Sequence, residues 1–452
     1  MTQGQTTPPT PPRALPAAGE TAHPETLALH AGWRAAPGHG AVAVPIVQST
    51  SYQFDSSEHA RALFALEQLG FTYSRTGNPT VDVLEKRLAA LEGGAAALAL
   101  GSGQAASAFA VLGLARAGDN IVSSTDLYGG TWNLFANTLK RFGIETRFVD
   151  PADPAAFARA SDARTRAWYG ETLPNPKLAV FPIAEVAELG RPLGIPLILD
   201  NTAAPLLARP FDHGAAIIVY SATKYLGGHG TSIAGAIIDS GRFDWSAHPA
   251  RQPALTEPDP SYHGTIWTEV AQRLGVQPYL AAVRSSLQRD LGAPLSPFNA
   301  FQILQGIETL PLRIQRHSET ASKVAGWLAR QPEVARVIHP SRQSGLQRER
   351  AERYLRGGFG GLVGLELAGG HAAGARFIDA LKLFYHVANI GDARSLAIHP
   401  ASTTHAQLSP AEQEASGVTP GYVRLSIGLE HPEDILADLR RGLDAAALRQ
   451  AA

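Results

Sequence analysis

Apolar runs that end on polar residues recur along the chain and predict buried strands. Residues 195–199 form one such run, which ends at Asp200, and residues 215–220 form another, which ends at Ser221 with Lys224 just beyond. Continuous apolar runs of this length are typical of strands covered on both faces. Because open α/β sheets bind ligands outside the carboxyl ends of their strands, Asp200 and Lys224 are expected at one crevice. An acid and an amine there suggest a bound cofactor.

Strand-like and helix-like segments alternate through the first two thirds of the chain. Further strands are predicted at 96–100, 120–124, 146–149 and 166–170, and helices at 57–69, 79–92 and 183–190. Asn78 suits the N-cap of the second helix, whose first residue is proline. This alternation predicts a mostly parallel sheet with helices on both faces.

The pattern changes after residue 242. Residues 243–290 are expected to form an insertion followed by a long helix. From about Ser296 onward, a helix at 311–330 alternates with short strands at 334–338, 361–367 and 422–427. These segments predict a smaller C-terminal α+β domain, so the expected fold class is α/β with a second domain.

Composition narrows the classes of protein. The chain of 452 residues is long enough for two or three domains, and its 39 basic against 40 acidic residues predict no nucleic-acid partner and no membrane surface as partner. Cysteine is absent, which excludes disulfides and thiolate chemistry and fits a cytoplasmic location. Residues 1–23 lack the apolar segment of a signal peptide and predict a disordered tail. The fifteen histidines show no metal-binding spacing, so no metal site is expected.

Lys224 lies between an apolar run and a glycine-rich segment, whereas most lysines are solvated on polar surfaces. Burial lowers the pKa of a lysine and makes it a usable nucleophile toward an aldehyde. A rival interpretation comes from Ser221 and Lys224 together, because they match the S-x-x-K pattern of serine acylases. The companion motifs of those enzymes are absent, and S-x-x-K alone is common by chance.

Four other features suggest a ligand site. Residues 101–104 (Gly-Ser-Gly-Gln) follow a strand and open a helix, which suits a monophosphate as well as it suits a plain tight turn. Tyr128 follows another strand and could cover a planar ligand or belong to the core. Arg424 interrupts a short apolar strand and needs a carboxylate, either of a ligand or of the protein itself. Tyr73 and Arg75 lie in a polar loop that could bind an anion or be merely solvated.

Taken as an ordered set, these stretches resemble the Cys/Met-metabolism family of pyridoxal-phosphate enzymes, from about Glu25 to Leu443. The resemblance rests on residues 73–80 (YSRTGNPT), 200–202 (DNT) and 221–224 (SATK). Residues 257–264 (EPDPSYHG), 295–300 (LSPFNA) and 398–405 (IHPASTTH) resemble its sulfhydrylase branch. The resemblance implies fold type I, with a tail at 1–23, an arm at 24–75 that reaches a neighbouring subunit, a large domain at 76–295 and a small domain at 296–452.

The resemblance also implies roles for individual residues around pyridoxal 5'-phosphate. Lys224 would bond to the cofactor aldehyde, Asp200 would pair with the ring nitrogen, and Tyr128 would stack on the ring. The other implied contacts are Gly103, Gln104, Ser221 and Thr223 at the phosphate, Tyr73 and Arg75 at the phosphate of a neighbouring subunit, Asn175 at the ring oxygen, and Arg424 with Asn389 at the substrate carboxylate. The active unit would be a homo-oligomer, with a dimer of dimers expected.

The implied activity is a γ-replacement that converts O-acetyl-L-homoserine and sulfide to L-homocysteine and acetate, a step of methionine biosynthesis. The alternatives are a cystathionine γ-synthase, a methionine γ-lyase, the Ser221 acylase and a cofactor-binding protein without catalysis. The chain departs from the usual family pattern at Gln104, at Leu173-Pro174 and at Arg394, and none of these departures removes a catalytic group.

Overall fold

The computed structural model describes residues 23–35, 40–404, 406, 409, 413 and 417–447. The predicted disordered tail lies outside these residues, apart from His23, and so does His405 of one family-like motif. Within the described part of the chain, no helix is long and apolar enough to cross a membrane.

The first part of the chain is built on a seven-stranded sheet in the order β1-β7-β6-β5-β4-β2-β3. Its strands are β1 (Ala96–Leu100), β2 (Asn120–Ser124), β3 (Glu145–Val149), β4 (Thr165–Glu171), β5 (Leu197–Asp200), β6 (Ile217–Tyr220) and β7 (Gly235–Asp239). Strands β2 to β6 pair in parallel, and β7 runs antiparallel between β1 and β6. The predicted mostly parallel sheet is therefore confirmed.

Side-chain alternation explains why the central strands are apolar throughout. In β5, Leu197 and Leu199 join the hydrophobic core on one face of the sheet, and Ile198 joins the core on the other. In β6, Ile218 faces the first core while Ile217 and Val219 face the second. Successive residues of a strand point to opposite faces, so a strand covered on both sides must be apolar at every position.

Helices cover both faces of this sheet. The helices of this part of the chain are α3 (Pro79–Glu92), α4 (Gly103–Leu112), α5 (Gly129–Asn133), α6 (Leu139–Arg141), α7 (Ala155–Arg159), α8 (Ile183–Gly190), α9 (Pro253–Thr256), α10 (Trp267–Leu274), α11 (Pro278–Ala282), α12 (Arg289–Leu291) and α13 (Pro297–Glu308). Helices α3, α8 and α13 contribute to one core, and α4 and α11 to the other. Asn78 caps α3 as predicted, because its side chain accepts hydrogen bonds from the backbone of Thr80 and Val81.

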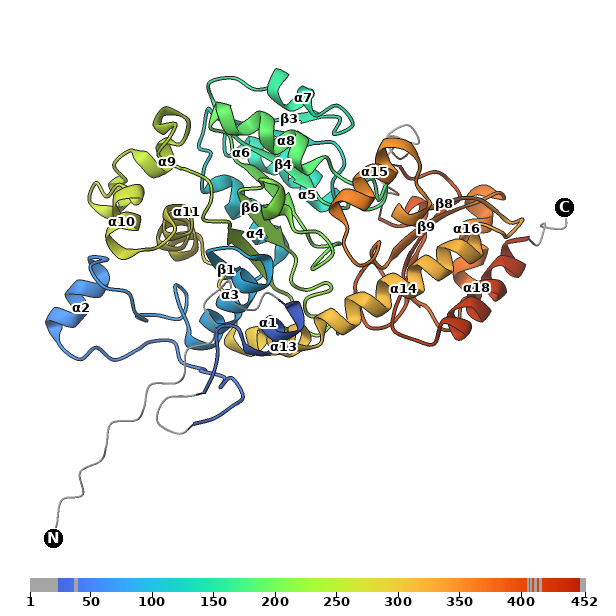
Figure 1. The fold of residues 1–452 in the computed structure, drawn as a ribbon, viewed down its shortest axis with the longest axis horizontal. Coiled ribbons are helices and arrows are strands. Elements are labelled where there is room, and N and C mark those ends of the chain that lie inside the picture. The colour runs from blue at the N-terminus through green and yellow to red at the C-terminus, as the bar shows by residue number, and fades with distance from the viewer. Residues whose placement is uncertain are drawn as a thin grey trace, which may run out of the picture.

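The C-terminal part has its own five-stranded sheet in the order β10-β11-β12-β9-β8. The strands are β8 (Val334–Ile338), β9 (Leu362–Leu367), β10 (Tyr385–His386), β11 (Leu396–Ile398) and β12 (Tyr422–Ser426), and the helices are α14 (Leu310–Leu328), α15 (Gly345–Tyr354), α16 (Gly370–Ala380) and α18 (Pro432–Ala447). Helices α14, α16 and α18 share a separate core with this sheet. Figure 1 shows α14 running from α13 toward the second sheet.

Three expectations about elements were wrong. Helix α2 (Ser57–Phe64) ends five residues before the predicted Leu69, because Leu66 adopts a left-handed φ of 51° and Glu67 N donates to Ala62 O. The long helix expected before residue 290 is divided, since Gly275 ends α10 with a φ of 66° and Pro278 begins α11. Strands β7, β10 and β11 were not predicted.

The N-terminal segment reaches away from both sheets. Helix α1 (Pro24–His30) packs near α3 and α13, whereas α2 and the loop around it extend outward, as the blue ribbon in Figure 1 shows. Asn78 Nδ2 fastens the base of this segment by donating to Val47 O, at 2.8 Å, and to the Tyr52 hydroxyl, at 3.0 Å.

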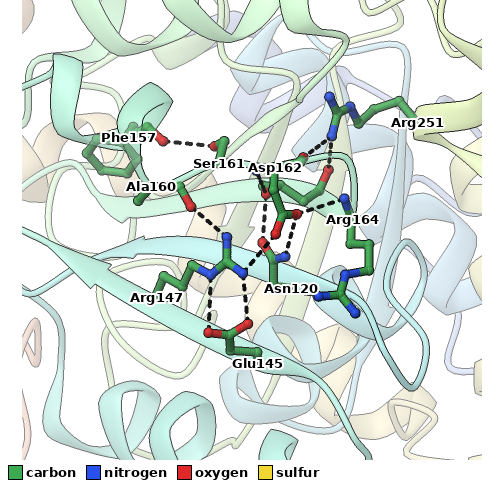
Figure 2. A network of polar contacts seen from close by, with 10 residues as sticks. Asn120, Glu145, Arg147, Phe157, Ala160, Ser161, Asp162, Arg164 and Arg251 are labelled. Atoms are coloured by element: carbon green, nitrogen blue, oxygen red, sulfur yellow. Dashed lines mark hydrogen bonds and ion pairs between the residues drawn. The ribbon is translucent and has the colours of Figure 1, made fainter.

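A polar network ties edge strand β3 to its neighbours at the amino ends of the strands (Figure 2). Arg147 on β3 bonds Asp162 at 2.8 Å, and Asn120 on β2 donates to the same carboxylate at 2.9 Å. The hydrogen bond from Asn120 is the largest of several contacts that lower the pKa of Asp162. The polar cluster thus fixes the edge strand opposite the carboxyl ends, where the candidate site lies.

Candidate active site

A cavity of about 280 Å³ lies at the carboxyl ends of β4 and β5 and between the two sheets. The predicted site residues that line it are Gly103, Gln104, Tyr128, Asn175, Asp200, Ser221, Thr223, Lys224, Asn389 and Arg424. Tyr73 and Arg75 do not line it. Residues from both halves of the chain therefore converge on one hollow, as expected for a ligand site at strand ends.

Lys224 lies in a tight turn four residues beyond the end of β6. Its backbone N–H donates to Ser221 O at 3.1 Å, and its carbonyl accepts from Gly228 N at 2.8 Å. Its Nζ donates to Asn389 Oδ1 at 2.6 Å. Burial, reinforced by the charge of Arg424, lowers the pKa of Lys224 to about 8. A large fraction of such an amine is neutral near pH 8, which makes it both a nucleophile and a base.

Asp200 is the last residue of β5 and lines the opposite side of the cavity from the second sheet. Its Oδ1 accepts from Thr202 N at 2.8 Å, and the Thr202 hydroxyl in turn accepts from Ser221 N at 2.8 Å. Burial raises the pKa of Asp200 to about 6 although Thr202 favours the anion. Among the described residues Asp200 has no ion-pair partner, so a cationic group of a ligand would stabilise its charge.

The turn before α4 forms a small cradle beside the Lys224 loop. Ser102 caps the helix by accepting from Ala105 N at 3.1 Å. Gly103 approaches Ser221 so closely that an added Cβ would lie 2.6 Å from the Ser221 Cβ. Backbone N–H groups at the start of a helix, with hydroxyls of Ser221 and Thr223 nearby, form an arrangement that can hold a phosphate.

Tyr128 lines the cavity and is about half exposed. Its backbone N–H donates to Glu171 Oε1 at 2.6 Å. A Cβ at Gly130 would lie 2.4 Å from the tyrosine ring, so the ring needs a glycine there to fold back over α5. An exposed aromatic face beside a lined cavity can cover a planar ligand.

Arg424 reaches the cavity from β12 of the second sheet. Its Nη2 donates to Asn389 O at 2.9 Å, and Asn389 also accepts from Lys224, so one loop holds both cations. Burial lowers the pKa of Arg424. Within the described part of the chain Arg424 pairs with no carboxylate, which leaves its guanidinium for the carboxylate of a ligand.

Tyr73 and Arg75 lie elsewhere in the same chain. Both are exposed on the loop between α2 and α3, which belongs to the N-terminal segment that extends outward. The Arg75 guanidinium lies 5.3 Å from the centre of the Tyr73 ring. Their predicted role in a neighbouring subunit's site remains a prediction.

Sequence reasoning missed several cavity residues, notably Glu171, Thr202 and Thr131. A signal was present for Glu171, because a carboxylate ends β4 just as Asp200 ends β5. Thr131 comes from α5 and donates to Gln104 Oε1 at 3.3 Å, a contact between distant segments that no local pattern reveals. The Ser221 acylase interpretation finds no support, since Lys224 Nζ bonds Asn389 in place of Ser221.

Comparisons with known proteins agree with this geometry. Residues 25–444 match the family described as Cys/Met metabolism PLP-dependent enzyme. An O-acetyl-L-homoserine sulfhydrylase of Leptospira meyeri is 51% identical over 93% of this chain and 96% of its own. A homocysteine/cysteine synthase of Saccharomyces cerevisiae is 46% identical over 93% of this chain and 98% of its own.

A solved structure is similar throughout. It is a putative O-acetylhomoserine (thiol)-lyase of Campylobacter jejuni that carries an N'-pyridoxyl-lysine-5'-monophosphate. It is 41% identical with a TM-score of 0.90, and the match covers 93% of this chain and all of that one. Fold and site together define a pyridoxal-phosphate enzyme of fold type I. The chain belongs to the Cys/Met metabolism family of PLP-dependent enzymes, and the predicted family and cofactor are confirmed.

The cavity fits pyridoxal phosphate on its own evidence. The buried Asn175 Oδ1 has no hydrogen-bond donor among the described residues, so its amide has capacity for a polar group of a ligand. Asp200 lacks a cation, Lys224 is poised for an aldehyde, and the Gly103 cradle suits a phosphate. These features correspond to the ring oxygen, ring nitrogen, aldehyde and phosphate of one molecule.

Proposed function

We propose that this enzyme converts O-acetyl-L-homoserine and hydrogen sulfide to L-homocysteine and acetic acid. The observation that carries the proposal is the convergence of Lys224, Asp200 and Arg424 on one cavity, in a chain about half identical to sulfhydrylases over almost its whole length. In the net reaction the Cγ–O bond to acetate breaks and a Cγ–S bond forms. One sulfide proton leaves with acetate, so the atoms balance.

Pyridoxal phosphate, when bound, supplies an aldehyde for the amino group and an electron sink for negative charge on adjacent carbons. Lys224 Nζ removes the proton from the substrate Cα and moves protons at Cβ as the leaving group departs. Its lowered pKa suits both tasks near neutral pH. Asp200 would place a negative charge at the ring nitrogen, and Tyr128 would cover the ring.

The second sheet binds the substrate. Arg424 has a planar fork of donors that matches a carboxylate, and Asn389 O holds one of its nitrogens at 2.9 Å. Asn389 Oδ1 also accepts from Lys224, which keeps the base close to the Cα of an amino acid bound at Arg424. The amino-acid end of the substrate is therefore oriented before sulfide arrives.

Two alternatives share this machinery. A cystathionine γ-synthase would use a larger thiol, and a methionine γ-lyase would eliminate without a new thiol. Relatives of the lyase type usually have a cysteine beside the stacking tyrosine, whereas Gly129 follows Tyr128 in this chain and cysteine is absent. This difference favours the replacement reaction.

The active unit is proposed to be at least a dimer, with Tyr73 and Arg75 completing the phosphate site of a neighbouring subunit and a dimer of dimers as the full assembly. The exposure of both side chains on the outward-reaching segment supports this assignment. An arginine beside a tyrosine ring is well suited to an anion.

The decisive assay presents purified enzyme with O-acetyl- or O-succinyl-L-homoserine, each with sulfide or with cysteine. Homocysteine from the acetyl ester and sulfide is expected to form fastest, and cystathionine from the succinyl ester and cysteine as the main product would refute the assignment. Lys224→Ala should lower the rate by about 10³-fold, as loss of a general base does. The matched control is Lys140→Ala, which removes an exposed lysine of α6 and should leave the rate unchanged.

A further inference from the structure

We propose that Glu171 is a positioning residue of the cofactor site, which holds the backbone of Tyr128 and carries the proton of a buried Glu171–Asp200 pair. The single negative charge of the pair then stays on Asp200. This inference rests on the proposed cofactor site and adds a residue to which no role has been given.

The geometry places the two carboxyl groups together. Glu171 ends β4 and Asp200 ends β5, and the two residues are partners in the parallel register of these strands. Side chains of in-register partners point to the same face of a sheet, and both residues line the cavity. Two carboxylates held this close in a buried site cannot both ionise without a large energetic cost, so they share a proton.

The hydrogen bonds decide which partner is ionised. Asp200 accepts from both the backbone and the hydroxyl of Thr202, and these donors favour its anion. Glu171 accepts one N–H, that of Tyr128, and is also repelled by the charge of Asp126. Burial and the adjacent Asp200 raise the pKa of Glu171 well above its usual value, whereas that of Asp200 rises to about 6.

The surrounding groups do not reverse this assignment. Asp126 is paired with Lys177 at 2.6 Å, so that lysine is engaged away from Glu171. The Tyr169 hydroxyl, which lies in the same region, bonds Ser107 at 3.0 Å and stays neutral because burial raises its pKa. The cavity cations Lys224 and Arg424 are both held by Asn389.

The consequence for the site is twofold. A protonated Glu171 still accepts the Tyr128 N–H through Oε1, so the tyrosine ring keeps its place over the cavity. It also limits the pair to one negative charge, which suits a single cationic ring nitrogen. A second carboxylate charge would raise the pKa of the ring nitrogen and of Lys224 together.

The test compares the apoenzyme with Glu171→Gln, which copies a neutral glutamic acid in shape and in its acceptor. The infrared difference spectrum between the two should contain the C=O stretch of a protonated carboxylic acid. Glu171→Gln should bind pyridoxal phosphate within about twofold of the unaltered enzyme. The pH titration of the bound-cofactor absorbance in Glu171→Gln should have its midpoint within about 0.3 pH unit of that in the unaltered enzyme. Glutamine and protonated glutamic acid are both neutral, so the substitution leaves the pKa values of neighbouring groups unchanged.

Two further variants complete the test. Glu171→Ala should weaken pyridoxal phosphate binding about fivefold, since Tyr128 N loses its partner, and a neutral hydrogen bond contributes about 1 kcal/mol. Asp200→Asn removes the neighbouring charge but leaves Glu171 buried, so the acid band should remain and should be lost at a lower pH than in the unaltered apoenzyme. The control is Glu188→Gln at an exposed position, whose difference spectrum should show the loss of an ionised carboxylate.

Loss of an ionised carboxylate band in Glu171→Gln, or a shift of its absorbance titration by about one unit or more, would overturn the inference. These results are separable from failure of the proposed function. Unaltered enzyme that bound no pyridoxal phosphate would refute the cofactor site, whereas the infrared measurement is made on apoenzyme and depends on neither binding nor turnover.

Discussion

Three half-buried charged groups at the cavity lack a partner of opposite charge within the described chain. Lys224 meets an amide oxygen, Asp200 meets donors of Thr202, and Arg424 meets a backbone carbonyl. Such groups do not stabilise the fold, because the free energy needed to remove a charge from water exceeds the free energy gained from these hydrogen bonds to neutral groups. The proposed function supplies these partners as parts of ligands, namely an aldehyde for Lys224, a cationic ring nitrogen for Asp200 and a substrate carboxylate for Arg424.

The pH dependence of cofactor uptake should report the state of Lys224. Its pKa of about 8 means that the amine is protonated below pH 8 and neutral above it. The rate at which apoenzyme takes up pyridoxal phosphate is thus expected to rise as pH increases through about 8 and then level off. Arg424→Met should move this inflection to higher pH, because it removes a repelling positive charge.

Stopped-flow absorbance at a series of pH values measures both inflections. Arg330→Met serves as the control, since Arg330 is exposed at the end of α14 and far from the described contacts of Lys224. An inflection near the ordinary lysine pKa in the unaltered enzyme would contradict the buried-amine assignment.

Arg424→Lys should retain the charge but lose the fork of donors. A hydrogen bond to a charged group contributes about 1.5–3 kcal/mol, so kcat/KM for O-acetyl-L-homoserine should fall about 10- to 100-fold. Steady-state kinetics with varied ester at saturating sulfide measure the change, and the apparent affinity for sulfide should be unaffected. An equal loss for the ester and for sulfide would point to general damage of the fold.

At the scale of elements, the cradle depends on the close approach of α4 to the loop that follows β6. Gly103→Ala would introduce a Cβ 2.6 Å from the Ser221 Cβ and push the two segments apart. Overpacking of this kind costs about 1–3 kcal/mol, so the dissociation constant of pyridoxal phosphate should rise about tenfold or more. Gly326→Ala on α14 is the control, because nothing lies within 4 Å of the added Cβ.

The N-cap of α3 anchors the N-terminal segment. Asn78 caps the helix with its Oδ1 and fastens the segment through Nδ2 contacts to Val47 and Tyr52. Asn78→Ala should lower the free energy of unfolding by about 1–3 kcal/mol, from a lost cap together with unpaired groups. Urea denaturation measures the loss. Ser56→Ala, which removes the exposed N-cap of α2, should lower the free energy of unfolding by about 1 kcal/mol or less and serves as the reference.

Local patterns predicted the elements whose burial is uniform. The strands that became β1, β5 and β6 carry apolar residues on both faces, so their sequence alone shows them, and Asp200 and Lys224 follow directly from the ends of β5 and β6. Strand β7 was missed because it follows the glycine-rich Lys224 loop without a helix between, which hides the start of a strand. The error at α2 has a different cause, since a left-handed Leu66 is not visible in an amphipathic pattern.

Cavity residues could be predicted from the sequence where a single short motif makes them stand out. They were harder to predict where segments distant in the sequence meet. Lys224, Asp200 and Arg424 each stand out in their own apolar surroundings. Glu171 has the same signal, yet its importance depends on two facts of tertiary structure, namely its register with Asp200 and its bond to Tyr128.

For the whole molecule, the cavity lies between two sheets, whereas Tyr73 and Arg75 are exposed and do not line it. A site that needs these residues can be completed only by a second chain, since they do not line the cavity of their own. Closed symmetric dimers place the same segment of each chain at the other's site.

Subunit complementation tests this arrangement. Arg75→Ala chains and Lys224→Ala chains, each with low activity alone, are mixed, unfolded and refolded together. A mixed dimer should contain one site with an intact Lys224 and an intact Arg75, so random pairing restores roughly a quarter of unaltered activity. Activity that stays at the level of the separate variants would show that Arg75 serves its own chain.

The position of Arg424 on β12, across the cavity from Asp200 on β5, has a thermal consequence. A molecule held at both ends acts as a removable cross-link between the two sheets, and its binding free energy adds to the resistance of the whole chain to heating. A non-reacting homoserine analogue, added to enzyme that already holds pyridoxal phosphate, would contribute about 2.7 kcal/mol at about 100 times its dissociation constant.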